Sequence, residues 1–436
     1  MRRKTLFDQP PLFGRFHHQD RDLLSRRNHV HTICDVRFTP FDVRFVPIAD
    51  MPSKSLHTTS KSIRASSRTK LAKQDRLLLL LGIVGQRKSQ TMSLVKHGPR
   101  RTQALILAVF SVFFLVSGSA PPAVARDADA WLVKGRLFGK HGKESTDISG
   151  IACSTAVGFP RSCLVIDDNL QSAQFVVVRD GKLVAGALVR LIFNEYRGKP
   201  LELDGEGVAY ADGYYYVIGS HGYPRDSQHK LDPIKDAGKI RARIAASSQI
   251  VRITANADAP AIVVTGKLRA IIAADPVLSP FLDRRLETNG LTIEGVAVKG
   301  GRLFAGFRTP SLDNGRAAVL SVRLGALFGT EPADTKLYQL PFGDGQGVRD
   351  LTPYANGFIV LAGPATDGDA YAVYWWDGVS ETTRLLRDLA DVTGKDGERK
   401  AEALLPLDES LSRLRVLILF DGEKQGAPVA IEIPRP

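Results

Sequence analysis

A short unit that recurs along the C-terminal part of the chain constrains the fold more than any other feature of the sequence. Glu206-Gly207-Val208-Ala209 recurs as Glu294-Gly295-Val296-Ala297. In both copies a glycine follows seven residues after the glutamate, at Gly213 and Gly301, and a run of apolar residues comes next. Asp350 also has a glycine seven residues further on, followed by an apolar run. The pattern predicts a repeated strand–turn–strand unit.

Looser copies at both ends extend the series to five. Aligned on their first position, the copies begin at Ser149, Glu206, Glu294, Asp350 and Glu402, with spacings of 57, 88, 56 and 52 residues. Repeats of this length fit the four-stranded blades of a β-propeller, because one blade cannot bury its two apolar faces alone. We therefore expect an all-β propeller of five blades, with room for a sixth in the long interval. A pair of β-sandwiches is the alternative, but it does not predict a fixed unit.

The net charge of +13 is confined to the N-terminal part of the chain. Residues 1–125 contain 21 Lys and Arg against 7 Asp and Glu, whereas the remainder contains 38 against 39. A nearly neutral body does not have the basic surface that nucleic-acid binding requires. We therefore expect no nucleic-acid partner.

The first 125 residues divide into two predicted segments. Residues 1–91 are a basic leader with no sustained period, for which disorder is expected. In residues 92–125, three basic residues precede the apolar run 104–117 and the site Ala123-Val124-Ala125. That order is typical of a cleaved secretory signal peptide, with Met92 as the true start. For residues 92–125 the alternative is an uncleaved membrane anchor, and for residues 1–91 it is a basic leader that is a genuine part of the protein. We expect residues 126–436 to be exported to the periplasm or outside the cell, without a stable membrane span.

Cys153 and Cys163 are the only cysteines after the predicted signal peptide. A pair in an exported protein predicts a disulfide, here closing a short loop between two β-like runs. Two buried free thiols are the alternative. Two cysteines without clustered histidines are a poor zinc site.

The repeat also predicts where chemistry would take place. The innermost strands of a propeller begin near its central channel, so we expect Glu206, Glu294, Asp350 and Glu402 to converge. Converging carboxylates need a cation, such as Ca²⁺ or another divalent metal, or pairing with Arg308 and Arg349. For any one of these four acids the alternative is a structural role, in which the carboxylate only accepts hydrogen bonds from backbone N–H groups in a turn.

Polar residues also follow the second apolar run of each unit. They are Asp167-Asp168-Asn169, Ser220-His221, Arg308, Asp367 with Asp369, and Asp421-Gly422-Glu423. A mixed site of this kind suits metal-assisted or acid–base hydrolysis of a small anionic or ester substrate. The catalytic candidates are Glu206, His221, Glu294, Arg308, Arg349 and Asp350. A lone histidine such as His221 is expected more often as an ordinary hydrogen-bonding residue than as a catalytic one.

Several short motifs together resemble one bacterial family. They are Ser149-Gly150-Ile151-Ala152, Glu206-Gly207-Val208-Ala209-Tyr210, Gly219-Ser220-His221, Ile293-Glu294-Gly295-Val296-Ala297, Gly347-Val348-Arg349-Asp350-Leu351, Ala362-Gly363-Pro364 and Phe420-Asp421. In these residues the chain resembles the domain of unknown function 3616 family, which is grouped near the esterase-like phytase propellers. The resemblance implies an exported propeller-like domain without an established activity, and the neighbouring family suggests ester or phosphoester hydrolysis. The other hypothesis is a non-catalytic binding or scaffold propeller with a structural ion or an arginine–carboxylate ring.

Overall fold

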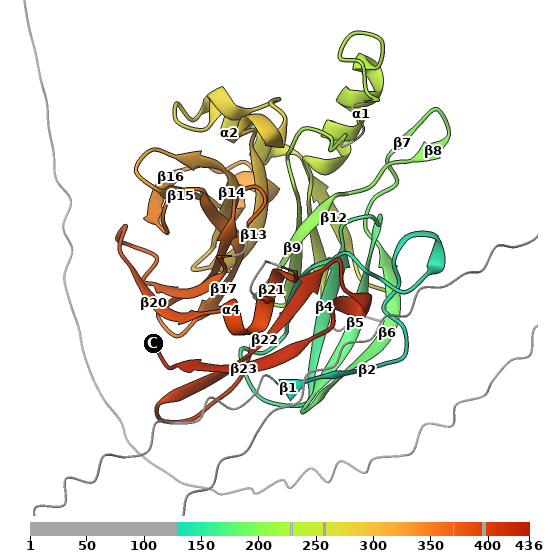
Figure 1. The fold of residues 1–436 in the computed structure, drawn as a ribbon. Coiled ribbons are helices and arrows are strands. Elements are labelled where there is room, and N and C mark those ends of the chain that lie inside the picture. The colour runs from blue at the N-terminus through green and yellow to red at the C-terminus, as the bar shows by residue number, and fades with distance from the viewer. Residues whose placement is uncertain (1–128, 227, 229, 256–258, 369, 395–397) are drawn as a thin grey trace, which may run out of the picture. The chain divides into compact units, whose positions relative to one another are not determined.

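The repeated units fold as the five blades of a β-propeller in a computed structural model (Figure 1). The structure describes residues 129–436 except 227, 229, 256–258, 369 and 395–397. The predicted leader and signal peptide, residues 1–91 and 92–125, lie outside the described residues, as does Asp369. No helix in the described part of the chain is long and apolar enough to cross a membrane.

The first four blades are antiparallel sheets of consecutive strands. Blade 1 consists of β3 (Ile148–Cys153), β4 (Arg161–Asp167), β5 (Ser172–Arg179) and β6 (Lys182–Arg190), with β2 (Leu132–Lys134) added parallel to β6. Blade 2 consists of β9 (Gly205–Ala211), β10 (Tyr214–Gly219), β11 (Ile250–Thr254) and β12 (Ile262–Thr265). Blade 3 consists of β13 (Thr292–Lys299), β14 (Arg302–Leu312), β15 (Arg316–Arg323) and β16 (Lys336–Pro341). Blade 4 consists of β17 (Gln346–Tyr354), β18 (Gly357–Pro364), β19 (Ala372–Trp376) and β20 (Thr383–Asp388).

Blade 5 is completed by a strand from the other end of the domain. Its inner strands are β21 (Lys400–Glu409), β22 (Arg413–Asp421) and β23 (Val429–Pro434), and its outer strand is β1 (Asp129–Ala130). β1 pairs with β23 so that Asp129 lies opposite Ala430. The two ends of the described chain therefore close the ring of blades on each other.

The innermost strands form a closed ring that accounts for five blades. β3 lies beside β9, β9 beside β13, β13 beside β17, β17 beside β21, and β21 beside β3. Within the described residues, the long interval of the repeat adds helices and not a sixth blade. These elements are α1 (Ala237–Ser247), α2 (Lys267–Ala274), η2 (Ser279–Phe281) and η3 (Leu286–Thr288).

The remaining elements are short. They are η1 (Lys140–Gly142), the hairpin β7 (Glu195–Tyr196) and β8 (Lys199–Pro200), α3 (Leu324–Phe328), α4 (Ala390–Thr393) and η4 (Lys424–Gly426).

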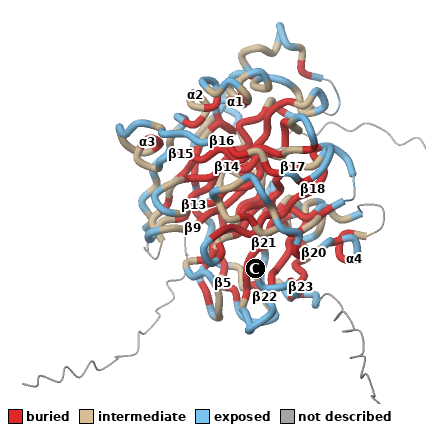
Figure 2. The backbone as a smooth tube through the Cα atoms, turned by 90° about the vertical axis from the view of Figure 1, so that its left-hand side faces the viewer, coloured by how far each residue is buried: buried red, intermediate tan, exposed pale blue. Residues whose placement is uncertain are grey.

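The hydrophobic core is divided among the interfaces between adjacent blades. Buried residues run through the middle of the blades (Figure 2). Between blades 3 and 4, for example, Phe304 packs against Phe358 with ring centroids 4.7 Å apart, and Trp376 stacks on Phe358. Every residue of β18 is buried, because each blade is covered on both faces by its neighbours. This agrees with the argument that single blades cannot be stable alone.

Two-residue turns join the first and second strands of blades 2 and 3. Asp212-Gly213 and Gly300-Gly301 have positive φ at both positions, which is the type I′ geometry of tight hairpins. In blade 4 the equivalent turn is Ala355-Asn356, because Tyr354 pairs with Gly357. Gly357 is therefore the first residue of β18 and not part of the turn.

The predicted disulfide is present. Cys153 on β3 lies directly opposite Cys163 on β4, and their Sγ atoms are bonded. Both residues are buried in the cluster between blades 5 and 1. The bond closes the loop that joins the two strands.

The loop length predicts the contribution of the disulfide to stability. In the double variant Cys153→Ala/Cys163→Ala we expect the free energy of unfolding to fall by about 2–3 kcal/mol, because the unfolded chain gains freedom when a short loop is no longer closed. Urea denaturation of the variant and of the reduced wild type measures this. Equal stability of the oxidised and reduced wild type would contradict the expectation.

Candidate functional site

Each innermost strand carries a one-residue β-bulge near its start. In β9, Gly205 and Gly207 pair with the consecutive residues Gly219 and Ile218, so Glu206 is the extra residue. The innermost strands of the other four blades show the same one-residue shift of pairing register against their second strands. The five bulged residues are Ser149, Glu206, Glu294, Arg349 and Glu402. Bulges re-aim side chains and are frequent next to functional sites.

The structure corrects the alignment of the fourth repeat by one residue. Arg349, and not Asp350, occupies the position of the glutamates, because Val348 pairs with Ala362 and Asp350 with Leu361. The error comes from the turn. In blades 2 and 3 the bulged residue lies seven residues before the second turn residue, and in blade 4 that turn residue is Asn356. Asn356 stands where blades 2 and 3 have a glycine, and Gly357 next to it shifted the alignment by one position.

Asp350 joins two strands instead of lying in the ring of bulged residues. Its Oδ1 accepts a hydrogen bond from the backbone N–H of Leu351, and its Oδ2 accepts one from Leu404 on β21, both at 2.7 Å. The side chain is buried. Burial raises the pKa of Asp350 to about 7, although the two backbone hydrogen bonds lower it. Both oxygens are thus engaged by backbone in the described structure.

Arg349 links the bulged glutamates on either side of it. Its Nε lies 3.0 Å from Oε2 of Glu294 in blade 3, and its Nη2 pairs with Oε1 of Glu402 in blade 5. The side chains of Arg349 and Glu294 are each only 1% exposed. Burying a guanidinium at this depth is costly, and pairing with carboxylates offsets that cost. The chain Glu294–Arg349–Glu402 therefore ties three blades together.

Arg308, which lies in β14 at the shift of register between Phe307 and Thr309, completes the neutralisation of Glu294. Its Nη1 lies 2.9 Å from Oε1 of Glu294, and its Nε donates to the carbonyl of Ala365 in the next blade. Burial raises the pKa of Glu294, but Arg308 and Arg349 together hold it below its ordinary value. Glu294 is thus an ionised carboxylate with a guanidinium on each oxygen.

The opposite side of the ring lacks such compensation. Oxygens of Asp168, Asp204 and Glu206 lie within 4.8 Å of one another. Glu206 is 3% exposed, and its buried Oε1 has no hydrogen-bond partner among the described residues. Arg225 Nη2 lies 3.8 Å from this oxygen and 3.7 Å from Oε1 of Glu294, and its side chain is 49% exposed. These ion pairs are longer than those of Arg308 and Arg349.

A second group of acids shares Asp168. It consists of Asp147, Asp167 and Asp168, with oxygens again within 4.8 Å. Burial and the Asp204 carboxylate raise the pKa of Asp168 to about 9, and burial raises that of Asp167 to about 6 although Ser145 donates to it at 2.6 Å. Burial and Asp204 raise the pKa of Glu206 well above its ordinary value. Crowded, buried carboxylates therefore favour protonation in the absence of a cation.

The charges around the ring do not balance. Five carboxylates, those of Asp168, Asp204, Glu206, Glu294 and Glu402, face the three guanidiniums of Arg225, Arg308 and Arg349. When all five are ionised, two negative charges exceed the guanidiniums, and they lie on the side of Asp168, Asp204 and Glu206; without a cation, protonation on this side removes them. Carboxylate oxygens in an irregular cluster are the donors that Ca²⁺ takes. The residues present therefore fit a divalent cation here.

The predicted metal ligands are thus distributed among different partners. Glu206 belongs to the uncompensated cluster, whereas Glu294 and Glu402 pair with arginines and Asp350 binds backbone. None of these last three belongs to either acidic group among the described residues.

His221 lies apart from the carboxylates in its described contacts. It is buried, with positive φ, and its Nδ1 lies 2.8 Å from the carbonyl oxygen of Gly219. Its backbone N–H donates to Ser247, and its carbonyl accepts from Arg269. Burial lowers the pKa of His221 to about 4, so the ring is neutral at pH 7.

Three residues of the site were missed by sequence reasoning. Asp147 and Asp204 precede inner strands, and Asp204 has positive φ and binds Ser220 Oγ. An acid two residues before the repeated unit in blades 1 and 2 was the available signal for both. Arg225 lies in the segment after β10, inside the long interval, where no repeat spacing could identify it.

Comparisons with known proteins bear on the fold and the family. The model of the family described as "Protein of unknown function (DUF3616)" matches residues 171–428. A comparison with curated proteins finds no match. Among solved structures, the chain is similar to a GH43 β-1,3-galactosidase at 7% identity and a TM-score of 0.39, covering 71% of this chain and 60% of that one. A fungal lectin from Aleuria aurantia, a six-bladed β-propeller, is 10% identical with a TM-score of 0.31, covering 66% and 76%.

The buried position of Arg349 predicts a large loss of stability on its removal. For Arg349→Met we expect the free energy of unfolding to fall by about 3–5 kcal/mol, because Glu294 and Glu402 then remain buried without their shared guanidinium. Chemical denaturation of the variant and the wild type measures this loss of unfolding free energy. The matched control is Arg316→Met, which removes a partly exposed pair with Glu381 and is expected to cost at most about 1 kcal/mol. Similar losses in both variants would contradict this view of Arg349.

The raised pKa of Asp350 predicts a pH-dependent stability. An aspartate in an unfolded chain titrates near about pH 4, so the folded state holds this proton more tightly between about pH 4 and 7. Its contribution is fully present below that range and is lost as the pH rises through it. Between about pH 4 and 8, we expect the wild type to lose on the order of 3 kcal/mol relative to Asp350→Asn. A difference between the two proteins that does not change with pH would contradict the assignment.

Proposed function

The protein belongs to the family described as "Protein of unknown function (DUF3616)", and we propose that it is a cation-assisted hydrolase of anionic esters, phosphoesters among them. The observation that carries the proposal is the uncompensated cluster of Asp168, Asp204 and Glu206 beside the half-exposed Arg225. The cluster suits a divalent cation, and the guanidinium suits the anionic group of a substrate.

The chain's own residues have separable roles in this proposal. Asp168, Asp204 and Glu206 would hold Ca²⁺ or another divalent cation, which when bound polarises an ester oxygen and acidifies a water. Arg225 binds the anionic group of the substrate. In the reaction, water forms a new bond to the phosphorus or carbonyl carbon, the ester bond breaks, and the leaving oxygen takes up a proton. Asp167, which belongs to the same acidic group as Asp168, would carry a proton from the attacking water to the leaving oxygen.

The arginine pairs support the reaction indirectly. Arg308 and Arg349 keep Glu294, in the blade next to that of Glu206, ionised and fixed. Because the charge of Glu294 is neutralised, the excess negative charge is localised on Asp168, Asp204 and Glu206, where the cation would bind.

Export to the periplasm or the cell exterior remains part of the proposal. The signal-peptide pattern of residues 92–125 and the Cys153–Cys163 disulfide support it.

A second function is favoured by a different observation. The buried chain Glu294–Arg349–Glu402 spans three blades, as expected of a scaffold whose central charges serve stability alone. In that case the protein binds a partner or a structural ion without turnover.

The two functions are separated by variants of the cluster. With Ca²⁺, Mg²⁺, Mn²⁺ or Zn²⁺ present, we expect turnover of the anionic ester p-nitrophenyl phosphate, and a loss of about 100-fold in kcat/KM in Glu206→Gln and Asp204→Asn, because each removes a negative charge and one carboxylate oxygen from the cation site. Calorimetric titration with CaCl2 should show the same loss of cation binding. Glu381→Gln, an exposed glutamate in blade 4, is the matched control.

The outcomes discriminate clearly. No turnover with any of the four cations, or activity unchanged in Glu206→Gln, would contradict the hydrolase. A melting temperature that falls after EDTA treatment without any turnover would favour the scaffold with a structural ion.

A further inference from the structure

The inner strands also form a cavity at the ends opposite the bulges. It has a volume of about 240 Å³ and is lined by the C-terminal parts of β3, β9, β17 and β21 together with the start of the disulfide-closed loop. The bulged residues lie two to four positions before the lining residues of the same strands. The cavity is therefore distinct from the acidic cluster.

The lining of the cavity is neutral. It contains no side chain of Asp, Glu, Lys, Arg or His from the described residues. Hydroxyl groups are supplied by Ser154, Thr155, Tyr210 and Thr352, and the rest of the wall is apolar, Ala156 and Pro353 included. Such a wall disfavours a charged ligand, because nothing would replace the hydration of the charge. It suits a molecule that has both an apolar face and hydroxyl groups.

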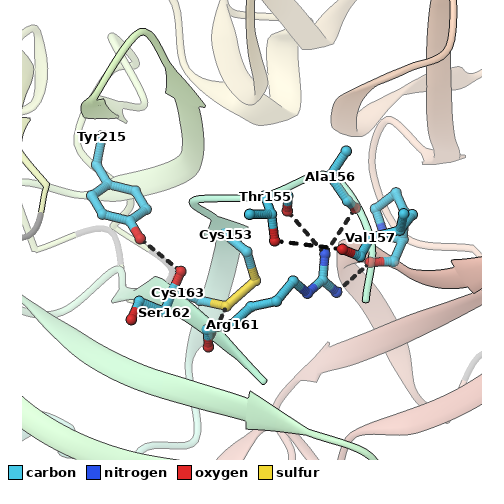
Figure 3. The surroundings of a disulfide bond; sticks show 9 residues. Cys153, Thr155, Ala156, Val157, Arg161, Ser162, Cys163 and Tyr215 are labelled. Atoms are coloured by element: carbon cyan, nitrogen blue, oxygen red, sulfur yellow. Dashed lines mark hydrogen bonds between the residues drawn. A yellow bond between two sulfur atoms is a disulfide. The ribbon is translucent and has the colours of Figure 1, made fainter. Parts of the chain in front are cut away.

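The loop that lines the cavity is held rigidly (Figure 3). The disulfide fixes its two ends, and the guanidinium of Arg161 donates to the carbonyls of Thr155 and Ala156 at 3.1 and 2.8 Å and to that of Pro406 in blade 5. The backbone N–H of Gly158 donates to Leu407 at 2.7 Å. A preformed wall reduces the entropy lost on binding.

Arg161 itself indicates that the shape of this loop matters. The residue is 3% exposed, and its described hydrogen bonds go to backbone carbonyls and not to a carboxylate. Burial lowers its pKa to about 10, which Asp408 opposes. Burying a guanidinium without a directly paired carboxylate costs stability, and what it maintains here is the wall of the cavity.

We propose that this cavity binds a small uncharged polyhydroxy molecule, with the chemistry of a neutral monosaccharide. Its volume corresponds to roughly eight molecules of liquid water, which admits one sugar ring. Tyr210 offers an aromatic ring for the apolar face, and the hydroxyls of Ser154 and Thr352 offer hydrogen bonds. The site is independent of the proposed hydrolase, since it shares no residue with the acidic cluster.

The proposal is tested with D-glucose, D-galactose and D-mannose as probes. Saturation-transfer NMR on the folded protein should detect at least one of them, and a titration gives its affinity. We expect Thr352→Val to weaken that affinity about fivefold through loss of one hydrogen bond, and Ala156→Trp to abolish binding by filling the cavity. Thr383→Val, on the outer strand β20, is the matched control and should bind as the wild type does.

Two further measurements separate the site from non-specific sugar contact. D-glucuronate should bind more weakly than D-glucose, because no cation lines the cavity, and reduction of the disulfide should weaken binding by releasing the loop. The proposal is overturned if none of the three sugars binds, or if binding survives unchanged in both Thr352→Val and Ala156→Trp. Loss of hydrolase activity in cluster variants has no bearing on either result.

Discussion

The buried guanidinium of Arg349 determines how charge is arranged across the propeller. It lies between Glu294 and Glu402, which come from the blades on either side, and Arg308 occupies the remaining oxygen of Glu294. A charge at this depth must be paired, so the positions of both glutamates follow from it. Because these pairs neutralise one side of the ring, the excess negative charge falls on Asp168, Asp204 and Glu206. The proposed cation site depends on this division.

One backbone feature, a β-bulge, positions the side chains of the ring. The same β-bulge occurs at the start of each inner strand, but its residue is a serine, a glutamate or an arginine depending on the blade. The fold therefore specifies the geometry of the ring, and the sequence at five positions specifies its chemistry. Propellers with the same bulges and other residues there would have different chemistry, which is why likeness of fold does not transfer function.

The sequence predicted the fold well because the fold is repetitive. Acidic residues, turns and apolar runs recur in register, so the five blades could be found without knowledge of long-range contacts. The one error of register, Asp350 in place of Arg349, came from a local substitution in a turn, where Asn356 replaces the expected glycine. The disulfide was predicted from the cysteine count together with the expectation that residues 126–436 are exported.

The site was predictable only in part, because it is built from contacts that sequence spacing does not encode. Spacing placed Glu206 and Glu294 together, but it could not show that Glu294 is neutralised and Glu206 is not. Arg225 lies in an interval that interrupts the repeat, and Asp204 gains its role only through its nearness to Asp168 from another blade. Pairings across blades depend on the closure of the ring.

The division of charge is tested most directly by locating a cation in a crystal. Crystals of the propeller domain, residues 126–436, grown with MnCl2 would give anomalous density at each bound ion. The account predicts a peak between Asp168, Asp204 and Glu206, with Glu294 and Glu402 still paired to Arg349. A peak at Glu294 and Glu402, or no peak at the cluster when Mn²⁺ is saturating, would contradict it.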